Sequence, residues 1–193
     1  PQRVNRGDAR VVEPRWSREW LAPSYRKGDT KHAYALQVLA RLFGGSETSR
    51  LWRAMVADNK LALSAYAGYS PTSLGLTSFG VGIQPVLTRT VMEIEAAVDF
   101  EMKKLVDGGV TADEVERAQN QLLAGAIYAE DSLASGPRIY GAVLSTGGTM
   151  AEIDAWPERI AAVTPADVVA AARVVWRDSG AVTALLTPAE GSR

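Results

Sequence analysis

The sequence predicts an α+β fold, in which a mostly antiparallel sheet of about four to six strands is packed on one side by several helices. Three observations predict it. Strand-like and helical segments are segregated along the chain, in the order strand, helices, hairpin, helices and strand. The central hairpin alternates apolar and small residues, and several helical segments begin with capping sequences.

The expected strands cover residues 13–25, 61–70, 74–84 and 180–187. In the first, Trp16 and Trp20 are interleaved with charges, and Pro14 and Pro23 indicate either an edge position or the strand ends. In the second, one row of residues alternates with small residues and is made of Leu61, Leu63, Ala65, Ala67 and Tyr69. A turn at 71–73 joins the two hairpin strands.

The expected helices cover residues 30–43, 48–58, 87–107, 111–129, 136–145, 149–162 and a last segment that begins at 164. Thr111 with Glu114, and Thr149 with Glu152, have the spacing of capping boxes. Glycine pairs such as Gly44-Gly45 follow helical runs, as is usual at helix C-termini.

The length of 193 residues fits one domain. We expect a linker or disordered lead-in over residues 1–12, a single domain over 13–190 and a tail from Pro188 to Arg193. The chain has 21 basic and 22 acidic side chains, which argues against a nucleic-acid partner. No apolar run approaches the ~20 residues of a membrane span.

Ligands for a catalytic metal are scarce in this sequence. It has no cysteine and one histidine, His32, and it lacks both H-x-x-E-H and H-E-x-x-H. We therefore expect no catalytic residue and no metal ligand in this chain, and a histidine at or near the surface. Glu95 and Asp99 share a helix face, where a solvated surface is the favoured interpretation over acid–base chemistry.

Aromatic side chains offer a candidate binding surface. A set at the sheet either lines a groove for an extended peptide or forms core, and it comprises Tyr66, Tyr69, Phe79, Trp16 and Trp20. Both alternatives remain open from the residues alone.

A series of short motifs resembles one known family. It comprises Gly44-Gly45, Ser49-Arg50-Leu51, Leu61–Ala65, Leu105–Ala118, Val163–Ala172 and Leu186-Thr187-Pro188. In order and spacing the series is similar to the C-terminal, non-catalytic domain of pitrilysin/insulinase-type zinc metallopeptidases. The resemblance covers about residues 15–188.

The resemblance implies that two homologous α+β domains enclose a chamber. Zinc is then expected in an N-terminal domain or partner subunit, and this domain closes the chamber and contacts peptide. Active relatives place an Arg–Tyr pair where this chain has Val56 and Leu63. With Tyr66 and Tyr69, these are the substrate-contact candidates.

The resemblance leaves two functions open. The parent protein is expected to be a zinc-dependent endopeptidase, with this chain inactive alone. The alternative is a non-catalytic assembly subunit, homologous to processing-peptidase or respiratory core proteins. A homo- or heterodimer fits either function. The compartment stays undetermined, with periplasm and cytoplasm both compatible.

Overall fold

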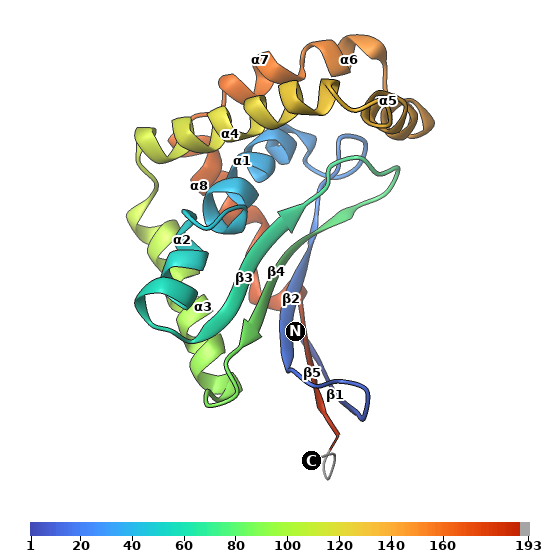
Figure 1. The fold of residues 1–193 in the computed structure, drawn as a ribbon. Helices are drawn as coiled ribbons and strands as arrows, with labels where there is room; N and C mark the ends of the chain where they lie inside the picture. Colours follow the sequence, from blue (N-terminus) through green and yellow to red (C-terminus); the bar gives the residue numbers. More distant parts are fainter. Residues whose placement is uncertain (190–193) are drawn as a thin grey trace.

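One five-stranded sheet, with helices against one of its faces, organises the chain in the computed structural model, which describes residues 1–189 (Figure 1). The strand order is β1-β5-β2-β4-β3; β1 and β5 are parallel and all other neighbours are antiparallel. The strands are β1 (Gln2–Asp8), β2 (Arg15–Ala22), β3 (Ala62–Tyr69), β4 (Thr77–Pro85) and β5 (Ala181–Pro188). This architecture confirms the predicted α+β class.

The helical segments lie close to where the sequence predicts them. They are η1 (Thr30–His32), α1 (Ala33–Gly44), α2 (Arg50–Trp52), η2 (Arg53–Asp58), α3 (Val91–Gly108), α4 (Ala112–Glu130), α5 (Ser135–Ser145), α6 (Met150–Asp154), α7 (Trp156–Ala161), α8 (Pro165–Val175) and η3 (Asp178–Gly180). Capping boxes at Thr90, Thr111, Thr149 and Thr164 begin α3, α4, α6 and α8. The second helix continues from α2 into a π-helical turn, η2. No helix of the described residues is long and apolar enough to cross a membrane.

Strand β2 lies in the middle of the sheet, between β5 and β4. Pro14 and Pro23 flank the strand directly, so they mark its ends, and the edge alternative was wrong. Trp16 and Trp20 point to the helix-covered face and are buried. Apolar residues at every second position thus anchor the centre of the sheet to the core.

The row of alternating residues predicted for β3 is interrupted near its start. The register between β3 and β4 is irregular from Ala62 to Ser64. There, an advance of two residues along β3 lies opposite an advance of one residue along β4, which is a β-bulge. Ala62, Ala65 and Ala67 are buried, whereas Leu63 is 54% exposed. The strict alternation expected for Leu63 was therefore wrong, because a bulge shifts the phase of the pleat.

The lead-in over residues 1–12 contains a strand that sequence reasoning missed. Gln2–Asp8 forms β1, which pairs with β5 in parallel. The strand is almost wholly exposed and polar, so it carries no apolar alternation to reveal it. The pairing with a strand 180 positions away depends on backbone hydrogen bonds. The tail expected at the C-terminus lies, from residue 190 on, outside the described part of the chain.

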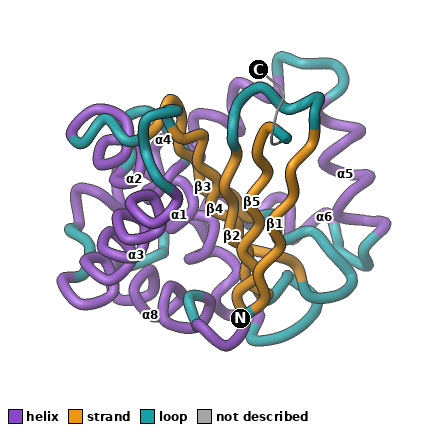
Figure 2. The backbone as a smooth tube through the Cα atoms, turned by 90° about the horizontal axis from the view of Figure 1, so that it is seen from below, coloured by secondary structure: helices purple, strands orange, loops and turns teal. Residues whose placement is uncertain are grey.

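The core lies between the sheet and helices α1, α3, α4 and α8 (Figure 2). Most of α1 is buried, and it packs against β3, α4 and α8. The Trp176 ring lies 4.8 Å from that of Phe43 and 5.9 Å from that of Phe79, joining helices to sheet. Within residues 1–189, no helix packs as a layer on the opposite face of the sheet.

Candidate functional site

The open face of the sheet, opposite α1, is the first candidate site. One central row of residues crosses all five strands. From β3 to β1, each of its members is paired with the next: Tyr66, Gly82, Ser17, Ala184 and Val4. Tyr66 is 58% exposed. A Cβ at Gly82 would lie 2.2 Å from the Tyr66 ring, so glycine there lets the ring lie flat on the sheet. Small residues thus form a shallow floor beside one aromatic ring.

Strand β3 is an edge strand, since it pairs with β4 alone. Leu63 and Tyr66 are both exposed on it. An edge strand presents unpaired backbone donors and acceptors, and it can take up an extended peptide as a further strand. Of the four predicted substrate-contact residues, these two lie on a surface that a peptide can reach.

The other two candidates have packing roles. The Tyr69 hydroxyl donates to the carbonyl of Pro23 at 2.6 Å, and its ring stacks on Phe79. Burial raises the pKa of Tyr69. Val56 lies in η2, half-buried against the core. Neither the Tyr69 hydroxyl nor the Val56 side chain is placed to stabilise charge on a substrate.

The remaining aromatic candidates belong to the core. Trp16, Trp20 and Phe79 are each at most 3% exposed. The groove interpretation therefore fails for these three, whereas Tyr66 is exposed and stays a candidate. Their alternation in the strand put them on the helix-covered face, which sequence alone could not distinguish from the open one.

The predicted solvated surface was wrong for Glu95, and the predicted position of His32 at or near the surface was wrong. Glu95 faces the sheet and accepts from Trp16 Nε1 at 2.9 Å and from Arg3 Nη1 at 2.6 Å, whereas Asp99 pairs with Arg18 and is exposed as predicted. They attach α3 to the sheet. His32 is buried at 8% exposure, with Nε2 3.5 Å from an Asp29 carboxylate oxygen.

Zinc does not fit this chain. Within residues 1–189 there is no group of three or more His, Asp or Glu side chains that could hold a metal ion. With a single histidine and no thiol, a hydrolytic zinc ion would lack its usual ligands.

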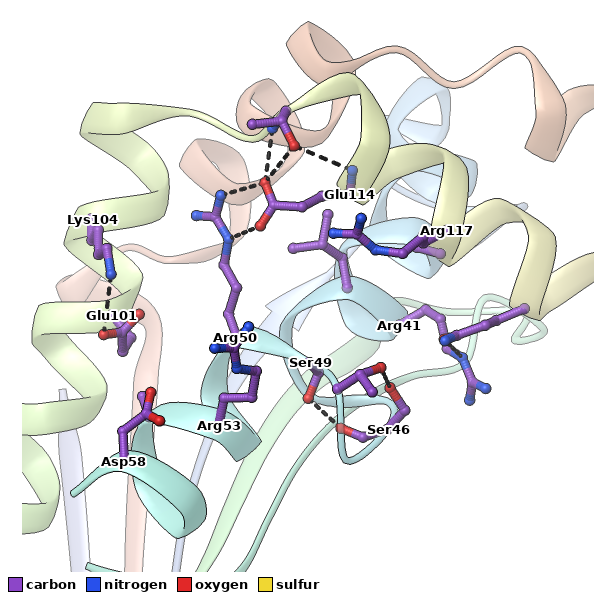
Figure 3. A pocket seen from close by; sticks show the side chains of 16 residues that line it. Arg41, Ser46, Ser49, Arg50, Arg53, Asp58, Glu101, Lys104, Glu114 and Arg117 are labelled. Atoms are coloured by element: carbon purple, nitrogen blue, oxygen red, sulfur yellow. Dashed lines mark hydrogen bonds and ion pairs between the residues drawn. The ribbon is translucent and has the colours of Figure 1, made fainter. Parts of the chain in front are cut away.

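A polar pocket of about 500 Å³ is the second candidate site (Figure 3). It lies between the end of α1, the α2–η2 segment, α3 and the start of α4. Its charged lining residues are Arg41, Arg50, Arg53, Asp58, Glu101, Lys104, Glu114 and Arg117. Sequence reasoning did not find this pocket, because its residues come from two stretches of the chain, 41–58 and 101–121, that meet only in the fold.

Arg50 and Glu114 form the fixed side of the polar pocket. Arg50 Nε and Nη2 donate to the two Glu114 oxygens at 2.6 and 2.7 Å, and Nη2 also donates to the carbonyl of Gly109. Thr111 donates to the same carboxylate through its backbone and hydroxyl. The bidentate bond from Arg50 lowers the pKa of Glu114 to about 2. This pair joins α2 to α4 and is structural.

The neighbouring arginines differ in their pairing. Arg41 donates to Gln121 and to the carbonyl of Gly45. Among the described residues, no ion pair or hydrogen bond is made by the side chains of Arg53 and Arg117. The pocket can attract an anion at these two groups. Its lining contains no histidine or thiol that could activate a nucleophile.

Replacing Glu114 with glutamine is expected to destabilise the domain by about 2 kcal/mol at pH 7, because it breaks a half-buried charge pair. The folded pKa of about 2 lies below the ordinary 4.5. The stabilisation is therefore complete above pH 4.5 and is lost as the pH falls towards 2. Urea unfolding at several pH values from 7 to 3 measures it. Glu116→Gln, on the exposed face of the same helix, is the control. An equal effect at pH 7 and pH 3 would contradict the prediction.

Comparison with known proteins agrees with this fold. Residues 13–122 match the family described as the peptidase M16 inactive domain. An uncharacterised zinc protease of Streptomyces coelicolor is 34% identical over 144 residues, which are 74% of this chain and 30% of that protein. This chain therefore spans about a third of the curated relative.

Two solved structures share the fold at low identity. A protease from Helicobacter pylori has a TM-score of 0.87 and 17% identity, over 96% of this chain and 44% of that one. A chain from Bordetella parapertussis, described as the inactive peptidase domain of a zinc protease, has a TM-score of 0.81 and 16% identity, over 97% and 95%. The resemblance found in the motifs is confirmed: the chain belongs to the peptidase M16 family, as an inactive domain.

Proposed function

We propose that this domain encloses peptide substrates together with a homologous zinc-bearing domain, which lies in the same polypeptide or in a partner subunit. The open sheet face turns towards the chamber and β3 contacts the peptide. The observation that carries the proposal is that face: unlike the helix-covered one, it is uncovered and bordered by an edge strand.

The domain's own part in the reaction is binding and orientation. Backbone groups of β3 pair with an extended peptide, while Tyr66 offers an apolar ring to one of its side chains. Beside that ring, the small side chains of Ser17 and Ala184 leave room for the peptide backbone to approach the sheet. Metal-activated water would be supplied by the zinc-bearing domain.

Peptidase activity of the full-length protein, with and without a partner subunit and a chelator, tests the proposal. We expect chelator-sensitive cleavage. Tyr66→Ala is expected to raise KM about 3- to 10-fold with little change in kcat, since it removes contact made in the bound state. Phe100→Ala, an exposed aromatic residue on α3, is the matched control. Unchanged KM in Tyr66→Ala would refute peptide contact at this face.

The alternative, a non-catalytic assembly subunit, is favoured by one observation. Val56 and Leu63 occupy the positions where the resemblance places an Arg–Tyr pair, and neither side chain can donate a hydrogen bond. Absence of chelator-sensitive cleavage in every combination of subunits would support this function and refute the first. Cleavage that requires a partner subunit would indicate that the partner subunit supplies the Arg–Tyr pair.

A further inference from the structure

The polar pocket of Figure 3 carries more positive than negative charge. Five cationic and three acidic side chains line it, a surplus of two positive charges, whereas the whole chain has a net charge of -1. Two of the cations are already neutralised by carboxylates, in the pairs of Arg50 with Glu114 and of Lys104 with Glu101. The surplus therefore arises from the other lining residues.

Three arginines of the pocket have no carboxylate partner within residues 1–189: Arg41, Arg53 and Arg117. The side chains of Arg53 and Arg117 donate to no described group. Arg41 is held by neutral acceptors through Nε and Nη1, which leaves its Nη2 without a partner in the same part of the chain. A guanidinium presents its N–H donors in a planar fork that matches the oxygens of a phosphate group. The pocket thus offers unused donors of the kind that bind phosphate.

These arginines come from elements that the fold holds in place. Arg41 lies in the last turn of α1, Arg53 begins η2 and Arg117 belongs to α4. The pair of Arg50 with Glu114 joins α2 to α4 through two hydrogen bonds, so the walls that carry Arg53 and Arg117 are connected beside the pocket. Figure 3 shows both side chains extending from their elements into it. The site is therefore formed before a ligand arrives.

The π-helical segment η2, Arg53–Asp58, lies at this pocket. It ends with a bond across five residues, in which the Asn59 N–H donates to the carbonyl of Ala54 at 3.2 Å. Three of its residues line the pocket: Arg53, Ala54 and Asp58. π-Helical turns are rare, and those that occur are frequently found at functional sites. The local backbone therefore agrees with a binding role for the pocket.

The charge and size of the pocket select among anions. A phosphate monoester carries about −1.5 to −2 charges at pH 7, which matches the surplus of two, whereas a carboxylate carries a single charge. The volume of about 500 Å³ is many times the ~30 Å³ of one water molecule, so an organic part fits beside the phosphate group. The described lining has no aromatic ring to stack on a nucleobase, but it has hydroxyl and amide groups at Ser46, Thr48 and Gln121.

We infer that this pocket binds a small phosphate-bearing ligand, either inorganic phosphate or a hydrophilic phosphate monoester such as a sugar phosphate. Arg53 and Arg117 bind the phosphate oxygens, and Arg41 adds the donors of its Nη2. The polar side chains of the lining face the organic part. The pocket lies among the helices and not on the open sheet face, so this inference does not depend on the proposed peptide contact.

Calorimetric titration of the full-length protein with inorganic phosphate and with glucose 6-phosphate tests the site without a peptidase assay. We expect a Kd on the order of 1 mM or tighter, as a few charge-assisted hydrogen bonds at a partly open site provide. Absence of measurable heat with both ligands at concentrations about 10-fold above that value would overturn the inference.

Arginine variants locate the binding within the protein. Arg53→Gln and Arg117→Gln are each expected to weaken it by about 10-fold or more, because each removes a charge-assisted contact. Both side chains are exposed, so their replacement leaves the core intact, and a urea unfolding curve of each variant verifies this. Arg138→Gln, at an exposed arginine of α5 outside the pocket, is the matched control. Wild-type affinity in both pocket variants would overturn the inference.

The choice of ligands separates the two sources of phosphate. Glucose 6-phosphate that binds more tightly than inorganic phosphate would support a phosphate monoester, and equal affinities would support inorganic phosphate. Glucose without its phosphate is expected not to bind. AMP that binds at least 10-fold more tightly than glucose 6-phosphate would overturn the inference, because it would show that a nucleobase is recognised.

Discussion

Gly44→Ala is expected to destabilise the domain by about 3 kcal/mol, as an overpacking substitution in the core. A Cβ at Gly44 would lie 2.2 Å from the backbone nitrogen of Ala67 and 2.7 Å from the Ala67 Cβ. Ala67 is held in β3 opposite Val81 of β4, so the strand cannot retreat without losing part of its ladder. Helix α1 would have to move away from the sheet. Urea unfolding at pH 7 measures the change.

Gly125→Ala is the matched control for this prediction. Gly125 lies inside α4, and a Cβ there would meet nothing within 4 Å. Alanine should stabilise that helix by about 0.5–1 kcal/mol, since glycine is the poorer helix former. If Gly44→Ala lowers the free energy of unfolding and Gly125→Ala raises it, the loss arises from the contact between α1 and β3 and not from the glycine-to-alanine change itself. A mild loss at Gly44, similar to that of a surface substitution, would contradict the close packing.

Phe79→Ala is expected to lower the free energy of unfolding by about 3–5 kcal/mol, the range for a large aromatic residue removed from a core. The Phe79 side chain is fully buried and contacts the rings of Tyr69 and Trp176. The loss combines transfer of the ring to water with a cavity that the sheet cannot close. Chemical unfolding of the variant and the parent domain measures it.

Phe100→Ala is the same substitution at an exposed site on α3 and should change stability by less than about 0.5 kcal/mol. The comparison also tests which face of the sheet is the core. If Phe79→Ala destabilised the domain as little as Phe100→Ala, the helix-covered face would not be the interior. The open face would then no longer be a candidate binding surface.

Most secondary structure was predictable because its signals are local. The capping boxes at Thr111 and Thr149 begin helices where the sequence placed them, since a cap needs only residues three positions apart. The prolines around β2 indicated either its ends or an edge position, and the structure decides for the ends. Strand β1 escaped prediction because its polar sequence carries no period, and only β5 holds it in the sheet.

The candidate site was predictable in part. Tyr66 was named from the sequence, and the structure leaves it exposed on an edge strand, whereas Tyr69 has its hydroxyl bonded to Pro23. The bulge that exposes Leu63 depends on the register with β4, which no local pattern encodes. The apolar residues of 136–145 were readable as a helix, but not as an uncovered one.

By itself the sequence determined the family, the order of the elements from β2 to β5 and the lack of a zinc ligand set, because motifs, caps and residue counts need no knowledge of distant contacts. The tertiary structure alone decided that Arg50 meets Glu114, that His32 is buried and that α5 stands without cover. These features arise when segments far apart in the chain pack together. Their burial and pairing depend on that packing, and the amino-acid order specifies it only through the fold as a whole.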